Sequence, residues 1–285
     1  TRPAADVVDD ALRLAREGHL APPFFLWVHF FDAHYPYHGA GSGSEHGATP
    51  PSGTDREAYA RAVAAMDRAV GRLLAELERR AGRSGLLTAV VADHGEGRGD
   101  HGERTHGFQL YDSTLRVPMI VHGPGVAPAV VRDPVSVVDL APTLLALTGV
   151  APGGGGGSVG IGGVDLLSSG APRSPVAFEA CHPYHSYGWS PLFGLVRGAD
   201  KWIDGPTPEL YDVVADPRED DERSAAVPAV ARSMRAALRE LGARHGPSER
   251  IALDASHAEE LRSLGYAGSA PHADALPPLP PGTPV

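Results

Sequence analysis

The sequence has 285 residues, of which 42% are hydrophobic and 21% are charged, and its formal net charge at pH 7 is −10. This composition indicates a soluble globular chain that can bury a sizeable core, as one large domain or as a domain with a smaller appendage. The negative charge argues against a nucleic-acid surface, which needs clustered lysine and arginine, and no apolar run reaches the length of a transmembrane helix.

Features that bear on the cellular compartment are few. Cys181 is the only cysteine, so the chain can form no internal disulfide, and the redox compartment stays open. The sequence has no signal peptide and begins Thr1-Arg2-Pro3 without a methionine. We therefore expect an earlier segment to precede it, and we predict neither a compartment nor an oligomeric state.

The N-terminal part begins with a predicted helix and a predicted buried strand. A short amphipathic helix includes Ala11–Arg16, and Phe24–Phe30 is apolar on both faces, as strands of parallel sheets are. Residues 39–53 form a loop rich in glycine, serine and proline. The capping-box pattern of Thr54–Glu57 then starts a long helix that ends near Gly82.

Three more strands and a helix are predicted in the central part. The strands cover Leu86–Val91, Val117–His122 and Val135–Val138, and Asp139 caps a helix over Leu140–Leu147. This alternation favours a layered α/β domain with a mainly parallel sheet.

The C-terminal part has a different character, with short strands close together in sequence. They predict a small antiparallel sheet followed by a helix over Val230–Leu241. The predicted strands are Pro175–Glu179, Leu192–Arg197, Lys201–Ile203 and Glu209–Asp212. A glycine-rich loop over Pro152–Gly163 precedes this part, and a proline-rich, disordered tail follows Ala267. The predicted organisation is an N-terminal remnant (1–23), an α/β core (24–170), a C-terminal subdomain (171–266) and the tail (267–285).

An acid–imidazole pair directly follows the predicted strand Leu86–Val91. Asp93 and His94 would lie at the strand's C-terminal end, where open α/β sheets bind their ligands. A carboxylate and a neutral imidazole can bind a divalent cation together, and Gly95 lets the backbone turn tightly around it. Eight of the 14 histidines fall between His29 and His122, which indicates a shared site rather than a chance dipeptide.

Two strand-end loops supply the other candidate residues. His34 follows the predicted strand Phe24–Phe30, and His101 and His106 follow the acid–imidazole pair. In a parallel sheet both loops fall on one edge, so these residues can face one pocket. His34 and His106 could then bind the oxygens of an anionic ester or protonate its leaving group.

Several motifs occur in order along most of the chain: Phe24–Tyr37, Val91–Glu96, Gly99–Glu103, Thr105–Gly107, Leu110–Pro118, Tyr187–Pro191, Glu209–Asp212, Ala215–Pro217 and Leu261–Tyr266. Together they resemble the sulfatase family of the alkaline phosphatase superfamily. The resemblance implies a three-layer α/β/α fold with a mainly parallel sheet. It also implies a small-molecule or glycan sulfate ester as substrate, and many family members are periplasmic, extracellular or membrane-attached.

The resemblance assigns roles to the candidate residues. Asp93 and His94 match two ligands of the family's divalent metal ion, most commonly Ca²⁺, and Mn²⁺ or Zn²⁺ in relatives that cleave phosphates and phosphonates. His34 matches the histidine that contacts the ester, and His106 falls near a substrate-binding lysine of many sulfatases. His101 is expected at the wall of the pocket.

The family's nucleophile has no match in these 285 residues. Sulfatases carry a cysteine in a Cys-x-Pro-x-Arg motif, which is converted to formylglycine, and relatives use serine or threonine. Cys181-His182-Pro183 lacks the arginine and follows Asp93 rather than preceding it, so we reject it. We expect a sulfatase part that is inactive by itself. The alternatives are a phosphodiesterase, a phosphonate hydrolase or a phosphoethanolamine transferase of the same superfamily, or a non-catalytic ligand-binding homologue.

Overall fold

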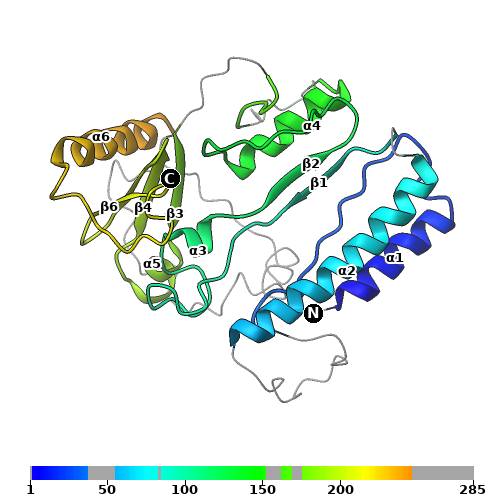
Figure 1. Cartoon of the computed structure of the whole chain (residues 1–285), viewed down its shortest axis with the longest axis horizontal. Helices are drawn as coiled ribbons and strands as arrows, with labels where there is room; N and C mark the ends of the chain where they lie inside the picture. Colours follow the sequence, from blue (N-terminus) through cyan, green and yellow to red (C-terminus); the bar gives the residue numbers. More distant parts are fainter. Residues whose placement is uncertain (1, 38–54, 83–84, 152–161, 169–174, 246–285) are drawn as a thin grey trace. The chain divides into compact units, whose positions relative to one another are not determined.

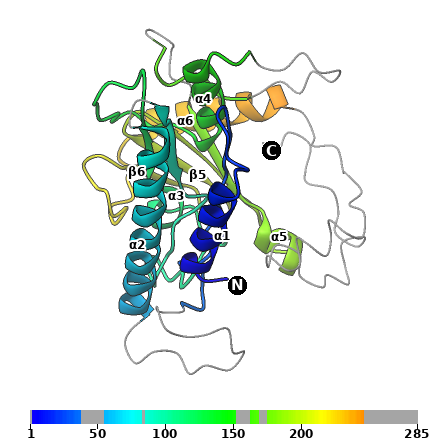
Figure 2. The same cartoon turned by 90° about the vertical axis from the view of Figure 1, so that its right-hand side faces the viewer.

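The computed structural model describes residues 2–37, 55–82, 85–151, 162–168 and 175–245. The chain forms two compact units, Thr1–Val90 with Met119–Ala127 and Val91–Pro118 with Pro128–Val285. The predicted subdomain boundaries after residues 23, 170 and 266 stay predictions. Figures 1 and 2 show the elements, which are α1 (Ala4–Arg16), α2 (Asp55–Ala81), β1 (Thr88–Val91), α3 (Asp112–Leu115), β2 (Met119–His122), the 3-10 helix η2 (Val137–Asp139), α4 (Leu140–Thr148), β3 (Val176–Ala180), α5 (His182–Tyr187), β4 (Leu192–Arg197), β5 (Asp200–Asp204), β6 (Glu209–Asp212) and α6 (Pro228–His245).

Helices α1 and α2 form the core of the first unit, and both were predicted. Small and aliphatic side chains lie between them, which lets the two backbones approach closely. The guanidinium of Arg72 on α2 lies 2.7 Å from the carboxylate of Asp9 and donates to the Ala5 carbonyl at 3.0 Å. Helix α2 ends where predicted, before Gly82, whose φ of 70° favours glycine. The buried side chains of this core are Ala4, Val8, Ala11, Leu12, Ala69, Leu73 and Leu77.

The segment Phe24–Phe30, predicted as a strand, is not one. Its side chains do alternate: Leu26 and Val28 pack against the α1–α2 core, while Phe25 and Trp27 are 84% and 81% exposed. A strand also needs a paired neighbour, because its amide and carbonyl groups must be satisfied by a ladder, and in the described residues no strand pairs with this segment.

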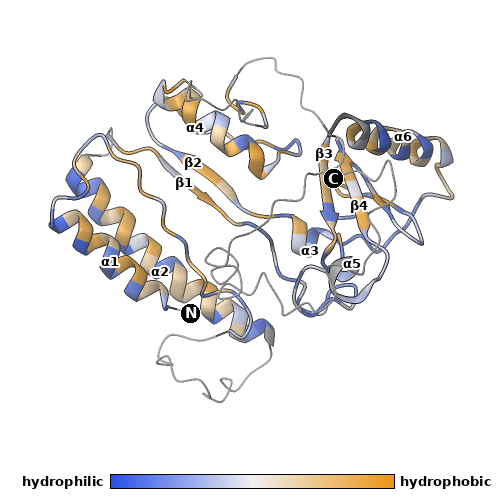
Figure 3. Ribbon diagram, turned by 180° about the vertical axis from the view of Figure 1, so that it is seen from behind, coloured by the Kyte–Doolittle hydropathy of each residue, from blue (hydrophilic) through white to orange (hydrophobic). Residues whose placement is uncertain are grey.

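The strands predicted before Asp93 and before Gly123 are confirmed in shorter form as β1 and β2. They make a two-stranded sheet, and both are coloured as hydrophobic in Figure 3. The other sheet in the described residues is the four-stranded antiparallel one of the second unit. The predicted mainly parallel sheet is therefore not confirmed by this part of the chain.

The C-terminal sheet is confirmed, with order β3-β4-β5-β6 and every pair antiparallel. In its register Leu195 lies opposite Trp202, and Trp202 lies opposite Leu210. These side chains face α6, whose Met234 and Leu238 are buried against them. The other face carries Leu192, Ile203 and Tyr211, which pack with Leu110, Tyr111 and Leu115. The segment around α3 thus covers this second face.

The predicted strand Val135–Val138 is wrong, since Val137 and Val138 belong to the 3-10 helix η2 and Ser136 is its N-cap. Its capping box explains the difference: the hydroxyl of Ser136 accepts from the amide of Val138, and the carboxylate of Asp139 accepts from the amide of Ser136. Asp139 stands at the N-cap position of α4, as predicted, but its side chain makes no cap hydrogen bond there and belongs to the capping box of η2 instead; Gly149 is the C-cap of α4.

Other expectations fall partly or wholly outside the described residues. These are the loop 39–53, Thr54 of the capping box, most of the glycine-rich loop Pro152–Gly163 and the tail after Ala267. Among the helices that the structure describes, none combines the length and the apolar character needed to cross a membrane.

Candidate active site

Backbone hydrogen bonds hold the acid–imidazole motif against α3. The amide of Gly95 donates to the Thr114 carbonyl at 2.7 Å, and the amide of Glu96 donates to the Ser113 carbonyl at 2.9 Å. A Cβ atom on Gly95 would collide with the carbonyl oxygen of Ser113. Glycine is required here because two backbones meet, rather than for the tight turn that the sequence predicted.

The rest of the loop is closed by Glu103. The amide of Gly97 donates to the Thr105 carbonyl at 2.7 Å, across the loop. The buried carboxylate of Glu103 accepts the amides of Phe108 and Gln109 at 2.8 and 3.1 Å. Burial raises the pKa of Glu103, although these two hydrogen bonds oppose the shift. The backbone is therefore fixed on both sides of His106.

The carboxylate of Asp93 and the imidazole of His94 lie next to each other. Oδ2 of Asp93 lies 3.7 Å from Nε2 of His94. Nδ1 of His94 is 2.9 Å from the Gly95 carbonyl, which fixes Nδ1 as the protonated nitrogen and leaves the lone pair on Nε2. Metal-binding imidazoles are commonly oriented by such a bond. The pair fits two positions of a divalent cation site, but no group of three or more His, Cys, Asp or Glu in the described residues could complete one.

His106 lies directly against His94. Their rings stack with centroids 3.9 Å apart and an interplanar angle of 27°. Nδ1 of His106 is 3.4 Å from Oε1 of Glu96, whose side chain is only 3% exposed. The Glu96 carboxylate orients the ring through Nδ1, and Nε2 of a protonated imidazole in this orientation can donate to an anion or to a leaving group. Sequence reasoning assigned no role to Glu96, although it belongs to the same motif.

His101 belongs to the same loop, but its ring is held by contacts with Glu219 and Tyr111. Its Nε2 donates to the Glu219 carbonyl at 3.0 Å, and its ring stacks on Tyr111 with centroids 3.6 Å apart. His34 belongs to the first unit, where its ring stacks on Phe31 at 4.4 Å. The structure thus brings Asp93, His94 and His106 together, while the predicted ester contacts of His34 and His101 stay predictions.

A buried ion cluster anchors the segment that follows the loop. Nζ of Lys201 lies 2.8 Å from Oδ1 of Asp112 and 2.6 Å from Oε1 of Glu219, and the lysine side chain is 1% exposed. The other Glu219 oxygen accepts the amide of Asp112 at 2.6 Å. Burial raises the pKa of Glu219, against the lowering by Lys201. Sequence reasoning missed this cluster, although one signal was present: Lys201 is the only lysine of the chain and lies within a strand.

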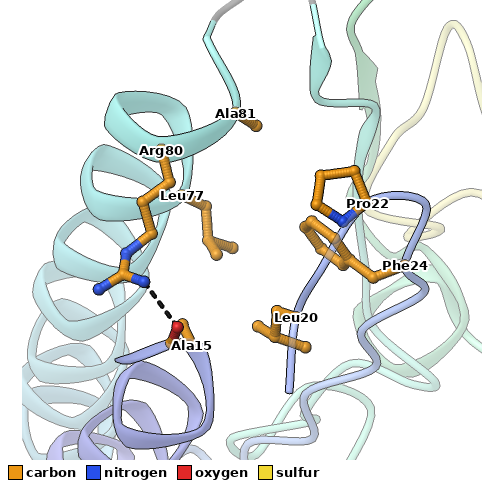
Figure 4. A pocket seen from close by; sticks show the side chains of 7 residues that line it. All are labelled: Ala15, Leu20, Pro22, Phe24, Leu77, Arg80 and Ala81. Atoms are coloured by element: carbon orange, nitrogen blue, oxygen red, sulfur yellow. Dashed lines mark hydrogen bonds between the residues drawn. The ribbon is translucent and has the colours of Figure 1, made fainter. Parts of the chain in front are cut away.

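A defined cavity of the first unit, of about 120 Å³, offers no comparable chemistry. Figure 4 shows its lining, which is apolar except for Arg80. The guanidinium of Arg80 donates to the Ala15 carbonyl at 2.7 Å. This cavity holds no pair of groups for acid–base or metal chemistry, so the acid–imidazole loop stays the candidate site.

Comparison with known proteins identifies the family. A sequence model of the sulfatases matches residues 3–150, which is more than half of the chain. The chain belongs to the sulfatase family. Choline-sulfatase of Rhizobium meliloti is 29% identical over 171 residues, which are 58% of this chain and 32% of that protein.

Solved structures of sulfatase-like enzymes share its fold. A protein from Bacteroides thetaiotaomicron assigned to the sulfatases superimposes with a TM-score of 0.56 at 25% identity, covering 67% of this chain and 43% of that one. The phosphonate monoester hydrolase of Agrobacterium radiobacter gives a TM-score of 0.54 at 24% identity, covering 67% and 42%. This sulfatase chain spans about a third of the length of the curated relatives it matches.

The single thiol of this sulfatase chain has the character of a structural cysteine. Cys181 packs against the sheet–α6 core. Burial, with a smaller effect from the charge of Glu179, raises the pKa of Cys181 to about 11. A thiol with this pKa is protonated at neutral pH and is a poor nucleophile.

Proposed function

We propose that these residues belong to a longer sulfatase that hydrolyses sulfate esters of small molecules or glycans. Asp93 and His94 would hold one divalent cation, and His34, His101 and His106 would bind the ester. The observation that carries this proposal is the orientation of His94, whose Nε2 lone pair lies beside a carboxylate and next to a second imidazole. We also propose for the whole protein the three-layer fold with a mainly parallel sheet.

The protein groups around the ester would act by position and charge. Glu96 holds His106 so that Nε2–H donates to an ester oxygen or delivers a proton to the departing alcohol. Asp93 and His94 supply one oxygen and one nitrogen ligand, a set that suits Ca²⁺ with further oxygen ligands, or Mn²⁺ and Zn²⁺. The cation, when bound, would withdraw negative charge from the ester oxygens. We assign the nucleophile to none of the described residues.

A phosphonate or phosphodiester hydrolase is the second candidate. The nitrogen ligand of His94 favours it, because imidazole suits transition metals better than it suits Ca²⁺. The fold supports both candidates, since it is shared with the phosphonate monoester hydrolase. A non-catalytic role of the chain is the third.

Hydrolysis assays separate these candidates. In a longer protein that contains these residues, we expect release of 4-nitrophenol from 4-nitrophenyl sulfate to exceed release from 4-nitrophenyl phenylphosphonate. His106→Ala should lower kcat about 10²–10³-fold if its donor acts in the transition state. Asp220→Asn, a change of an exposed carboxylate, is the control and should leave kcat unchanged. Faster cleavage of the phosphonate would favour the second candidate.

The 285-residue chain by itself is expected to be inactive and to bind Ca²⁺ weakly, because calcium affinity grows with the number of charged oxygen ligands. Repeated turnover of an aryl sulfate by this chain alone would contradict the proposal.

A further inference from the structure

Four aromatic rings gather beside the acid–imidazole loop, all within the second unit. Phe108 follows the loop, while His182, Tyr187 and Trp189 belong to α5 and the residues after it. The ring of Phe108 stacks on Tyr187 with centroids 6.1 Å apart and meets Trp189 at 6.2 Å. The ring centroids of Tyr187 and Trp189 are 5.5 Å apart. The rings of His182 and Phe108 meet edge to face, with centroids 5.7 Å apart. We call Phe108, Tyr187 and Trp189 the aromatic platform.

The end of α5 gives the platform its shape. Gly188 adopts a left-handed conformation with a φ of 70° and closes the helix through its amide, which donates to the Tyr184 carbonyl at 2.9 Å. The amide of Trp189 then donates to the Pro183 carbonyl at 3.3 Å. This turn brings Trp189 back beside Tyr187.

The platform combines one half-buried ring with two largely exposed ones. Tyr187 and Trp189 are each 59% exposed, whereas Phe108 is half-buried. Single exposed aromatic residues are ordinary on protein surfaces. Adjoining exposed rings form a contiguous apolar patch, which marks an interaction site because each ring offers a large apolar area.

The location of the platform connects it to the ester site. Phe108 comes directly after His106-Gly107, and its amide is held by Glu103, which also fixes the backbone around His106. Phe108 of the platform therefore lies two residues after His106, the proposed sulfate-binding residue. Figure 1 shows α5 beside the loop that precedes α3.

We infer that the aromatic platform of Phe108, Tyr187 and Trp189 binds an aryl ring, the organic group of an aryl sulfate whose head group lies at His106. The inference rests on the proposed function for its head group. Tyr187 and Trp189 lie side by side and are both largely exposed, so they offer a flat apolar area that suits an aryl ring better than a sugar, whose hydroxyl groups need polar partners.

Binding of four small probes to the 285-residue chain in the presence of CaCl₂ tests this assignment. The probes are phenyl sulfate, methyl sulfate, phenol and glucosamine 6-sulfate, measured by calorimetry and by ligand-observed NMR. We expect phenyl sulfate to bind most tightly. Trp189→Ala and Tyr187→Ala should each weaken its binding roughly three- to tenfold, the effect of one aromatic pair, without changing the Kd of methyl sulfate.

Trp27→Ala is the matched control, because Trp27 is also exposed, at 81%, but belongs to the first unit. It should change no Kd. Equal affinity for phenyl and methyl sulfate, or tighter binding of glucosamine 6-sulfate, would overturn the aryl assignment. If phenol binds in a Trp189-dependent manner and phenyl sulfate binds no better, the platform is supported and the sulfate ester function is contradicted.

Discussion

Replacing Lys201 by methionine should destabilise the second unit more than any surface change of charge. Methionine fills most of the space of the lysine stem, so the effect is electrostatic rather than a cavity. Nζ of Lys201 lies 2.8 and 2.6 Å from the Asp112 and Glu219 carboxylates. At such distances each attraction is about 6 kcal/mol for an effective dielectric constant of about 20, and desolvation offsets much of it. Breaking a buried pair costs about 3–5 kcal/mol, since the remaining charges stay buried.

Urea unfolding followed by tryptophan fluorescence measures this cost, because Trp202 is only 4% exposed, packs against α6 and becomes exposed on unfolding. Arg235→Met is the control, because Arg235 pairs with Asp204 at 3.4 Å on the surface and should contribute less than about 1 kcal/mol. A Lys201→Met chain within about 1 kcal/mol of the wild type at pH 7 would refute the reasoning. The deficit should shrink in acid, as the carboxylates left without Lys201 take up protons.

Three further changes test the loop and the thiol. Gly95→Ala should lower the free energy of unfolding by about 1–3 kcal/mol, because its Cβ meets the Ser113 carbonyl, whereas Gly71→Ala in α2, with open space around it, should raise it by about 0.5–1 kcal/mol; equal effects in urea unfolding would contradict this. Burial raises the pKa of Glu103, so its contribution to the free energy of unfolding is fully present below the ordinary pKa of about 4.3 and is lost as pH rises through the raised pKa. Glu103→Gln should therefore remove this decrease in the free energy of unfolding with rising pH. An unchanged pH dependence would exclude Glu103 as its source. Cys181, with a pKa of about 11, should react with iodoacetamide at pH 8 roughly twentyfold more slowly than free cysteine, because the small thiolate fraction outweighs its higher nucleophilicity; a rate equal to that of free cysteine would show that the thiol is not buried.

The parts of the fold that follow from local pattern were predicted well. The two helices of the first unit and the strands of the C-terminal sheet show helical or strand character within their own sequences. The segment Phe24–Phe30 was mispredicted because an apolar run does not reveal whether a partner strand lies beside it. Val135–Val138 was mispredicted because the side chains of Ser136 and Asp139 bond to the local backbone, which outweighs the strand preference of valine.

The candidate site was predictable in part for the same reason. Asp93 and His94 are neighbours in sequence, so their cooperation could be inferred directly. The contact between Glu96 and His106, ten residues apart, depends on a loop closed by Glu103 and on glycines packed against backbone. The Lys201 cluster joins residues that are 89 positions apart, and only the folded chain brings them together.

Paramagnetic line broadening by Mn²⁺ tests the proposed metal site most directly. In a ¹⁵N-histidine-labelled chain, added Mn²⁺ should broaden the ring signals of His94 first and those of His106 next, because the two rings are stacked 3.9 Å apart. Asp93→Asn should reduce this broadening strongly by removing a charged ligand. If His94 keeps sharp signals while histidines elsewhere broaden, or if Asp93→Asn changes nothing, the acid–imidazole pair is not a metal site and the account fails.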